Sequence, residues 1–309
     1  MAKKWIAPHA GGIDVLDFIE EETPAPGPGG VTIEVRAAGM NPADYKHLER
    51  ATDGFPLGIG YEVAGVLAAV GPDTQIASGP CHPGDQVVAF RVQGGYTDEL
   101  TVPARDVFAM PDGLSFPEAA NLLLAATTAA EMLEVTAVDQ HDVVLIHAAS
   151  GAVGISAVQQ ARWRGARVIG TASHAGTDRV RSFGGIAVEY GPGLEQRVRD
   201  LAPDGIDAVL DAAGTDEAVQ VSLAVRRSPV RAVTIVRGAA TDAAGFVAIG
   251  GAMPASKAFR DDVRAELLAR AGAGELTVPV ARTFALEDAK EALHFLQQGH
   301  PGGKLALVP

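Results

Sequence analysis

Two glycines at a fixed spacing follow a run of apolar residues near the middle of the chain. The run ends at Ala148, and the pattern Ala148-x-x-Gly151-x-x-Gly154 leads into a stretch with small residues on its early turns. Small residues at this spacing let the backbone turn tightly, approach a pyrophosphate closely and pack a helix against a strand. The first amides of such a helix carry partial positive charge toward the phosphates. The pattern therefore predicts dinucleotide binding, with a purely structural turn as the alternative.

The residues after the next expected strand bear on the choice of dinucleotide. NAD-binding enzymes place a carboxylate about 20 residues after the glycine turn, where it accepts the ribose 2′-hydroxyl. Here the stretch Gly170–His174 contains no acid, and none appears before Asp178. Ser173 can donate to a 2′-phosphate, and His174 or Arg179 can add positive charge. We expect a preference for NADPH over NADH, with indifference between the two as the alternative.

Strands and helices alternate around the glycine turn. We expect strands, several of them continuous apolar runs, at Asp142–Ala148, Arg167–Thr171, Ile186–Tyr190, Ala208–Ala212, Arg231–Val236 and Phe246–Ile249. We expect helices at Glu118–Val135, Val153–Arg164, Asp178–Phe183, Leu194–Leu201 and Asp216–Val225. Apolar runs without alternation are typical of strands covered by helices on both faces. The pattern predicts an α/β fold with a Rossmann doubly wound parallel sheet.

The first third of the chain is rich in β-branched residues and turn residues. Short runs separated by Gly and Pro predict strands at Val31–Arg36, Val63–Val70, Gln86–Phe90 and Glu99–Val102. The chain ends with a helix at Leu286–Gln298 and an apolar run at Leu305–Val308, which can return to complete this module. We therefore expect a β-rich catalytic domain over 1–117, completed by 267–309, and a Rossmann NADP-binding domain over 118–266.

The composition restricts the compartment and the partners. A length of 309 residues suits about two domains, and a net charge of −13 disfavours nucleic acid and anionic membranes, which an acidic surface repels. The single cysteine, Cys81, excludes an intramolecular disulfide and fits a reducing compartment. The amino terminus has no signal-peptide pattern, and the apolar stretch Ala119–Ala130 falls short of the roughly 20 residues that cross a bilayer. A cytoplasmic protein is expected.

Short motifs are distributed over nearly the whole chain in a characteristic order. They are Gly39-Met40-Asn41-Pro42-Ala43-Asp44-Tyr45-Lys46, Gly60-Tyr61-Glu62-Val63-Ala64-Gly65, Gly84-Asp85-Gln86-Val87, Gly94-Gly95-Tyr96, Met110-Pro111-Asp112-Gly113-Leu114-Ser115, Ala119-Ala120, Thr127-Thr128-Ala129, the glycine turn, Gly170-Thr171-Ala172-Ser173 and Gly303-Lys304. Their order and spacing resemble the medium-chain dehydrogenase/reductase superfamily, specifically its zinc-free quinone oxidoreductase, zeta-crystallin-like branch. The resemblance implies a partly open, GroES-like β-barrel catalytic domain, with the cofactor in a cleft against the Rossmann domain.

The same resemblance implies an activity and an assembly. Members of this branch transfer a hydride from NADPH to quinones, α,β-unsaturated carbonyls or related acceptors. A homodimer is expected from the family, and the apolar strand at Phe246–Ile249 supports it, because an exposed apolar edge strand is a liability unless it is paired. Two alternatives stay open: an enoyl-thioester reductase, and a non-catalytic NADPH-binding protein.

Zinc ligands are missing where the zinc-dependent relatives carry them. Those enzymes have a cysteine near the position of Met40 or Asn41 and a histidine at that of Tyr61. Thioether, amide and phenol groups are poor replacements for thiolate and imidazole. The adjacent Cys81 and His82 lie in a Gly/Pro loop and are interpreted as an exposed turn. No metal is expected, and conjugated acceptors are then favoured because they delocalise the incoming negative charge.

The resemblance also supplies candidate site residues. The catalytic candidates, expected on the substrate side of the cleft, are Asn41, Asp44, Tyr45 and Tyr61. Each has a structural alternative, since Asn41 can begin a turn, Asp44 can cap the following helix, and a tyrosine can lie in the core with its hydroxyl bonded. The cofactor-binding candidates are Thr128, Ala148, Ser150, Gly151, Ala152, Val153, Gly154, Thr171, Ser173, Arg179, Tyr190 and Lys304. Two interpretations are structural: His147 as a core histidine, and Arg226, Arg227 and Arg231 as a solvated loop.

Overall fold

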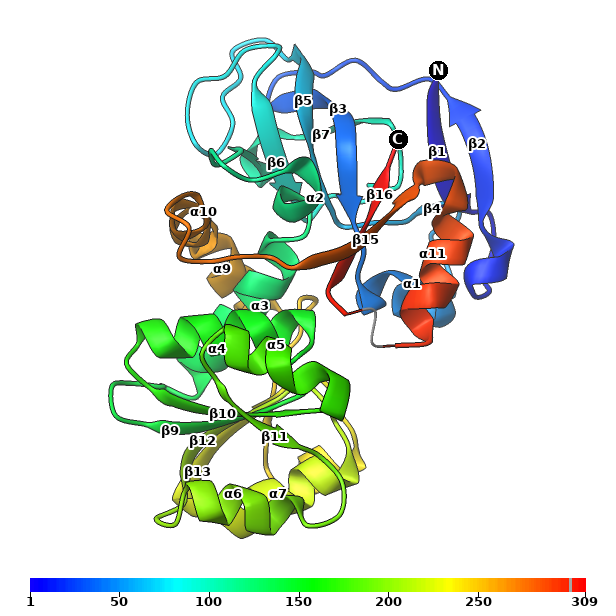
Figure 1. The fold of residues 1–309 in the computed structure, drawn as a ribbon. Helices are drawn as coiled ribbons and strands as arrows, with labels where there is room; N and C mark the ends of the chain where they lie inside the picture. The colour runs from blue at the N-terminus through cyan, green and yellow to red at the C-terminus, as the bar shows by residue number, and fades with distance from the viewer. Residues whose placement is uncertain (300–301) are drawn as a thin grey trace. The chain divides into compact units, whose positions relative to one another are not determined.

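The computed structural model describes residues 1–299 and 302–309, with the side chains of 228–230 left out of the description. The chain forms two compact units: Met1–Leu124 together with Leu268–Pro309, and Ala125–Leu267 (Figure 1). Two helices carry the chain from one unit to the other, α3 (Leu123–Val135) and α10 (Arg264–Gly272). The sequence placed these boundaries after residues 117 and 266.

The first unit is built on a seven-stranded sheet in the order β15-β16-β3-β5-β6-β8, with β7 also paired to β3. The strands are β3 (Gly30–Gly39), β5 (Glu62–Val70), β6 (Gln86–Phe90), β7 (Glu99–Pro103), β8 (Val107–Ala109), β15 (Val280–Ala285) and β16 (Lys304–Val308). A smaller sheet has the order β2-β1-β4 and consists of β1 (Ala2–Ala7), β2 (Asp17–Glu21) and β4 (Leu57–Gly58). The carboxy-terminal strand β16 lies antiparallel to β3, so the end of the chain joins its beginning.

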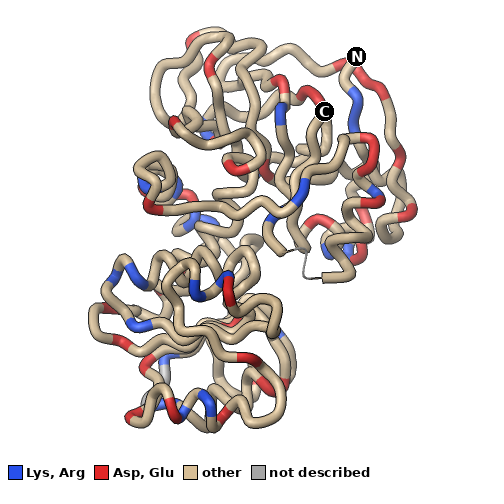
Figure 2. The backbone as a smooth tube through the Cα atoms, viewed as in Figure 1, with Lys and Arg blue, Asp and Glu red and all other residues tan. Residues whose placement is uncertain are grey.

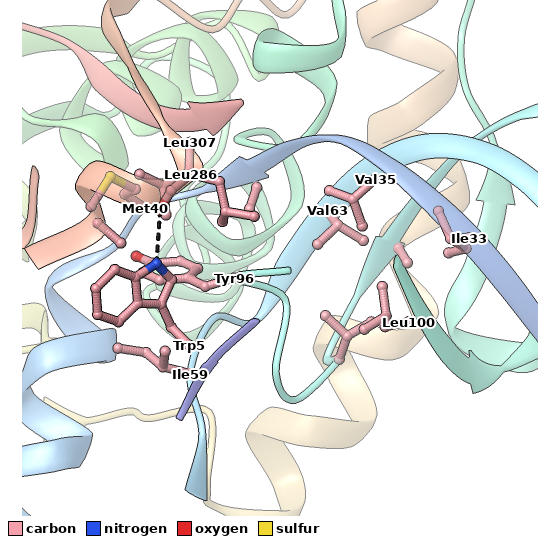
Figure 3. Close-up of a cluster of buried hydrophobic side chains, with 14 of the residues drawn as sticks. Trp5, Ile33, Val35, Met40, Ile59, Val63, Tyr96, Leu100, Leu286 and Leu307 are labelled. Atoms are coloured by element: carbon pink, nitrogen blue, oxygen red, sulfur yellow. Dashed lines mark hydrogen bonds between the residues drawn. The ribbon is translucent and has the colours of Figure 1, made fainter. Parts of the chain in front are cut away.

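The core of this unit explains why distant segments close on one another. Alternate residues of β3, including Ile33 and Val35, are fully or almost fully buried, as the period-2 pattern of a half-covered strand requires. The indole of Trp5 packs in the same cluster and donates its Nε1 hydrogen to the carbonyl of Leu286 at 2.7 Å (Figure 3). One hydrogen bond therefore links the first strand to the carboxy-terminal segment.

The second unit is a parallel six-stranded sheet in the order β11-β10-β9-β12-β13-β14. Its strands are β9 (Val143–His147), β10 (Arg167–Ala172), β11 (Ile186–Glu189), β12 (Ile206–Asp211), β13 (Arg226–Thr234) and β14 (Val247–Ala248). On β9, Val144 and Ile146 belong to one apolar cluster and Leu145 to another. Both faces of the sheet are thus buried, and the predicted α/β fold with a Rossmann sheet and a β-rich GroES-like unit is confirmed.

Helices cover both faces of the parallel sheet (Figure 1). The first pair, α4 (Ala152–Trp163) and α5 (Thr177–Ser182), contributes to the cluster that contains Val144. The second pair, α6 (Leu194–Leu201) and α7 (Asp216–Val225), contributes to the cluster that contains Leu145. The bounds of α6 and α7 are those the sequence predicted.

The predicted single helix over Glu118–Val135 is wrong. The structure has two helices, α2 (Phe116–Ala119) and α3, separated by Ala120–Leu122. The side chain of Asn121 donates to the carbonyl of Pro117 at 2.9 Å, and such bonds from Asn to nearby backbone compete with helix continuation. Local side-chain chemistry therefore ends the first helix four residues after it begins.

The interpretation of Arg226, Arg227 and Arg231 as a loop is also wrong, although Arg226 and Arg227 are exposed to solvent as expected. All three lie in β13. Arg227 pairs with Asp207 at 3.0 Å, and Arg231 pairs with Asp142 at 2.7 Å. Aspartates from distant parts of the chain therefore neutralise Arg227 and Arg231. Such partners cannot be predicted from the residues next to the arginines in the sequence.

Acidic and basic residues are interspersed over both units (Figure 2). No helix in the described ranges is long and apolar enough to cross a bilayer.

At the edge of the parallel sheet, β14 pairs with β13 and leaves Val247 half-exposed. The homodimer expected through this edge stays a prediction.

The close approach of β3 to the break between α2 and α3 generates a stability prediction. A Cβ added at Gly39 would lie 2.0 Å from the carbonyl oxygen of Ala120, which is backbone and cannot swing away. Gly39→Ala should therefore lower the free energy of unfolding by about 1–3 kcal/mol or more. Gly12→Ala is the control, because its Cβ would meet nothing within 4 Å. Equal denaturation midpoints for the two variants would contradict this account.

Candidate functional site

The glycine turn has the shape of a phosphate cradle. Ala148 adopts a left-handed backbone with φ of 55°, a conformation that glycine reaches most easily. A Cβ at Gly154 would lie 2.4 Å from the carbonyl oxygen of Ala148, so only glycine lets α4 pack this closely. Helix α4 begins after Gly151 without a side-chain cap, and its first amides have no partner within the helix. These features suit a dinucleotide pyrophosphate.

Thr171 lies beneath the turn and supports it. Its hydroxyl is within hydrogen-bond distance of the Ala148 amide, at 3.3 Å, and of the His147 ring, at 3.2 Å. The other ring nitrogen of His147 lies 2.9 Å from the hydroxyl of Ser222. Burial lowers the pKa of His147 well below its usual range, so the ring is neutral at pH 7. The interpretation of His147 as a core histidine is confirmed.

Arg179 lies beside the turn, as expected of a residue that could reach a cofactor phosphate. Its guanidinium donates to the carbonyl of Ser150 at 3.1 Å. Ser150 in turn lies against Gly176, where an added Cβ would come 2.6 Å from its hydroxyl oxygen. The structure thus brings Ser150 and Arg179 together at the start of α4.

An acid that the sequence did not reveal lies at the end of the neighbouring strand. Glu189 of β11 is in register with Ala172 of β10, so it lies one strand away from the strand end where an NAD-binding enzyme carries its carboxylate. Its Oε1 lies 2.7 Å from Nδ1 of His174, and this hydrogen bond raises the pKa of His174. Ser173 is partly exposed and Tyr190 is half-exposed at the same edge.

Thr128 is buried within α3. The helix packs beside α4, because the side-chain amide of Gln160 donates to the carbonyl of Ala126 at 2.9 Å. The cofactor contacts expected of Thr128, and of the other residues around the turn, stay predictions.

A second polar cluster lies in the first unit, around the ammonium of Lys304. This group is almost fully buried, as is Glu62. It donates to the carbonyl of Met40 at 2.9 Å and to Oδ1 of Asn41, and lies 3.3 Å from Glu62 Oε1. The amide nitrogen of Asn41 donates to the same Glu62 oxygen at 2.9 Å. Both ends of the Asn41 side chain are therefore committed, and Lys304 has a structural role the sequence did not predict.

Asp44 occupies the third position of helix α1 (Pro42–Arg50) and caps it, as the structural alternative proposed. Its Oδ2 accepts hydrogen bonds from the backbone N–H of Asn41 at 2.7 Å and from the hydroxyl of Tyr96 at 2.8 Å. Its Oδ1 is buried and has no hydrogen-bond partner in the described residues. Burial raises the pKa of Asp44 from 3.8 to about 7, against the lowering effect of its hydrogen bonds and of Lys304.

The other two catalytic candidates have different surroundings. Tyr45 packs its ring partly into the hydrophobic core. Tyr61 is partly exposed, and its hydroxyl contacts Nδ1 of His47. His47 is exposed and lies one turn after Asp44 on α1. Burial, and then the charge of Asp44, raise the pKa of Tyr61. The catalytic roles of Asn41, Asp44, Tyr45 and Tyr61 stay predictions.

Sequence reasoning gave no role to Glu62, Tyr96 or His47. Glu62 stands at the head of an otherwise apolar strand, and an acid in such a run is a usable signal, because a buried carboxylate requires partners. Tyr96 and His47 carry no comparable signal. Their contacts join residues far apart in the chain.

The described residues contain no group of three or more His, Cys, Asp or Glu side chains placed to hold a metal ion. The amide of Asn41 is taken by Lys304 and Glu62, so it is a poor metal ligand as it stands. The expected absence of a metal stays a prediction.

The burial of Asp44 predicts an unusual dependence of stability on pH. A carboxyl whose pKa rises on folding favours the native state fully below pH 3.8, and this contribution is lost as the pH rises to about 7. The loss is at most about 1.4 kcal/mol per pH unit. Asp44→Asn, neutral at every pH, should flatten the decline of the thermal midpoint over this range, whereas Asp17→Asn on an exposed strand should not. Parallel profiles for all three proteins would contradict the burial argument.

Two family profiles match the chain: the alcohol dehydrogenase GroES-like domain over residues 27–112, and a zinc-binding dehydrogenase over residues 188–307. A spectinabilin polyketide synthase system protein from Streptomyces orinoci is 35% identical over 99% of this chain and 14% of its own length. The synaptic vesicle membrane protein VAT-1 homolog of Mus musculus is 35% identical over 62% of this chain and 48% of its own. The chain thus spans less than half of these relatives. A trans-enoyl reductase from Aspergillus flavipes is 33% identical over 71% of this chain and 68% of its own.

Solved structures are similar over the full length. A mycobacterial quinone oxidoreductase is 28% identical with a TM-score of 0.82, and each chain is covered completely. A mycobacterial protein complexed with NADPH is 27% identical with a TM-score of 0.85, over 99% of this chain and 100% of the other. Together with the Rossmann sheet, the GroES-like unit and the glycine turn, these similarities show that the chain belongs to the medium-chain dehydrogenase/reductase superfamily, in its branch of quinone oxidoreductases and VAT-1-like proteins.

Proposed function

We propose that the protein is an NADPH-dependent oxidoreductase that reduces quinones or α,β-unsaturated carbonyls without a metal. The observation that carries the proposal is the cradle at the glycine turn. Gly154 admits no side chain, and the uncapped start of α4 offers its amides to an anion. The structural relative complexed with NADPH supports the choice of cofactor.

NADPH supplies a hydride when it is bound. The glycine turn, from Ala148 to Gly154, would hold the pyrophosphate through backbone amides. Ser173 and Arg179 would hold the 2′-phosphate, because Arg179 is already fixed beside the turn by its bond to Ser150. Thr128, Tyr190 and Lys304 complete the proposed set of cofactor residues.

On the acceptor side, the proposed groups are Asn41, Asp44, Tyr45 and Tyr61. Met40 and Asn41 stand near the position where zinc relatives carry a cysteine ligand. The carbonyl of Met40 and the side-chain oxygen of Asn41 both accept hydrogen bonds from Lys304. An acceptor here must therefore stabilise its own negative charge. Quinones and enones do so by conjugation, and a phenol such as Tyr61 can supply the proton that a reduced enone requires.

An enoyl-thioester reductase is the second candidate. It is favoured by the polyketide synthase relative, which matches 99% of this chain, and by the trans-enoyl reductase relative. The chemistry is the same hydride transfer to a conjugated carbonyl, and the acceptor differs only in its thioester. A non-catalytic NADPH-binding protein is the remaining alternative.

A turnover panel tests the function. Purified protein should oxidise NADPH in the presence of 1,4-quinones or simple 2-enones, and exhaustive chelation should leave the rate unchanged. Turnover confined to an enoyl thioester would favour the second candidate, and binding of NADPH without turnover of any acceptor would favour the binding protein. Gly154→Ala should abolish NADPH binding in calorimetry, because its Cβ would displace the turn, whereas Gly12→Ala should bind normally.

Cofactor choice is tested separately. The wild type should prefer NADPH over NADH in kcat/KM by about tenfold to a hundredfold for each charged contact to the 2′-phosphate. Ser173→Ala with Arg179→Ala should remove most of this preference. Arg181→Ala is the matched control, because it removes a cation from the same helix whose partner is Asp178. A preference that survives the double substitution, or one that Arg181→Ala lowers equally, would contradict the assignment.

A further inference from the structure

His47 and Tyr61 contact each other outside the hydrophobic cluster that forms the core of the first unit. His47 lies on the exposed side of α1, and its Nδ1 directly contacts the Tyr61 hydroxyl. The two rings stack with centroids 5.9 Å apart and planes inclined by 13°. In the described part of the chain this imidazole is the one hydrogen-bond partner of the Tyr61 hydroxyl. A partly buried phenol is therefore joined to solvent through a histidine.

The surroundings of Tyr61 keep its proton in place. Burial and the nearby charge of Asp44 raise the pKa of the phenol, so it stays protonated at neutral pH. A phenol of this kind can give its proton only to a strong base, such as an enolate, and must then regain it quickly. Histidine is the side chain that most readily exchanges protons with water near pH 7.

We propose that His47 is a positioning residue that returns the proton to Tyr61 during reduction of an enone. The inference rests on the proposed function. After hydride addition to the β-carbon, the α-carbon of the enolate takes the proton of the Tyr61 hydroxyl, so a C–H bond forms and the O–H bond breaks. The phenolate oxygen then takes the Nδ1 proton of the imidazolium. Water returns a proton to the exposed ring, and no electrons beyond those of the hydride are involved.

The protonation state of His47 sets the direction of its hydrogen bond with the Tyr61 hydroxyl. A neutral Nδ1 accepts the hydroxyl proton and turns it away from the acceptor. A protonated Nδ1 donates to the phenol oxygen and leaves the hydroxyl proton free for the product. His47 thus orients the Tyr61 proton as well as replacing it.

Enone and quinone acceptors separate this role from a structural one. Protonation of an enolate carbon is slow and needs a positioned acid, whereas the oxyanion of a hydroquinone is protonated rapidly by water. The variants are His47→Phe, which keeps a stacked ring, Tyr61→Phe, and the two combined. His47→Ala, which leaves space for a free imidazole, serves for chemical rescue. Lys46→Ala on the adjacent exposed position of α1 is the control.

We expect His47→Phe to lower kcat for 2-cyclohexenone by about tenfold to a hundredfold, at the lower end of general acid effects. The rate with 1,4-benzoquinone should stay within about twofold. The double variant should be no slower than Tyr61→Phe alone, and imidazole in the buffer should partly restore His47→Ala. Lys46→Ala should match the wild type with both acceptors.

Three results would overturn the relay while the proposed function stands: an unchanged enone rate in His47→Phe, equal losses with both acceptors, or quinone turnover by a wild type that reduces no enone. Additive losses in the double variant would overturn it as well. Failure of the wild type to oxidise NADPH with any acceptor would remove the proposed function and the relay together.

Discussion

A buried ion pair holds the first unit in the arrangement on which its candidate site depends. Lys304 and Glu62 lie 3.3 Å apart with side chains only 5% and 1% exposed, and burying such charges is costly unless every group is bonded. The remaining bonds go to Met40, to Asn41 and to the amide of Leu124, which Glu62 Oε2 accepts at 2.9 Å. Loss of either partner would leave an uncompensated charge at a cost of about 3–5 kcal/mol. The last strand, the end of β3, the start of α1 and the start of α3 therefore meet at one point.

The positions of the other site residues follow from this point. Asn41 is fixed by the ion pair and begins α1, so Asp44 falls one turn along and reaches back to cap it. His47 falls one further turn along the same helix, on the side of Tyr61. Tyr61 precedes Glu62 in the chain and is held by the same anchor. The Lys304–Glu62 salt bridge thus aligns α1 with the start of β5, although it contacts neither His47 nor Tyr61.

The second unit depends on backbone shape more than on charge. The glycine turn is defined by the left-handed Ala148 and by the space that Gly154 leaves for α4, and both are local properties. The edge that would meet the adenosine end is different, because it is assembled from two strands. Glu189 pairs with His174 there and neutralises a cation that the sequence alone offered to a phosphate. The balance of charge at this edge is therefore less basic than the residues after β10 suggested.

The sequence by itself determined the features whose causes are local. Continuous apolar runs predicted the parallel strands, the glycine spacing after Ala148 predicted the turn, and the stretches between the expected strands predicted α6 and α7 to the residue. Tertiary structure decided whatever requires a partner from elsewhere. Examples are the pairing of β16 with β3, the contact of Lys304 with Glu62 across 242 positions, and the register that sets Glu189 beside His174. Turns and helix periods arise from neighbours a few residues apart, whereas the cost of a buried charge is offset only by groups that the closed chain brings within hydrogen-bond distance.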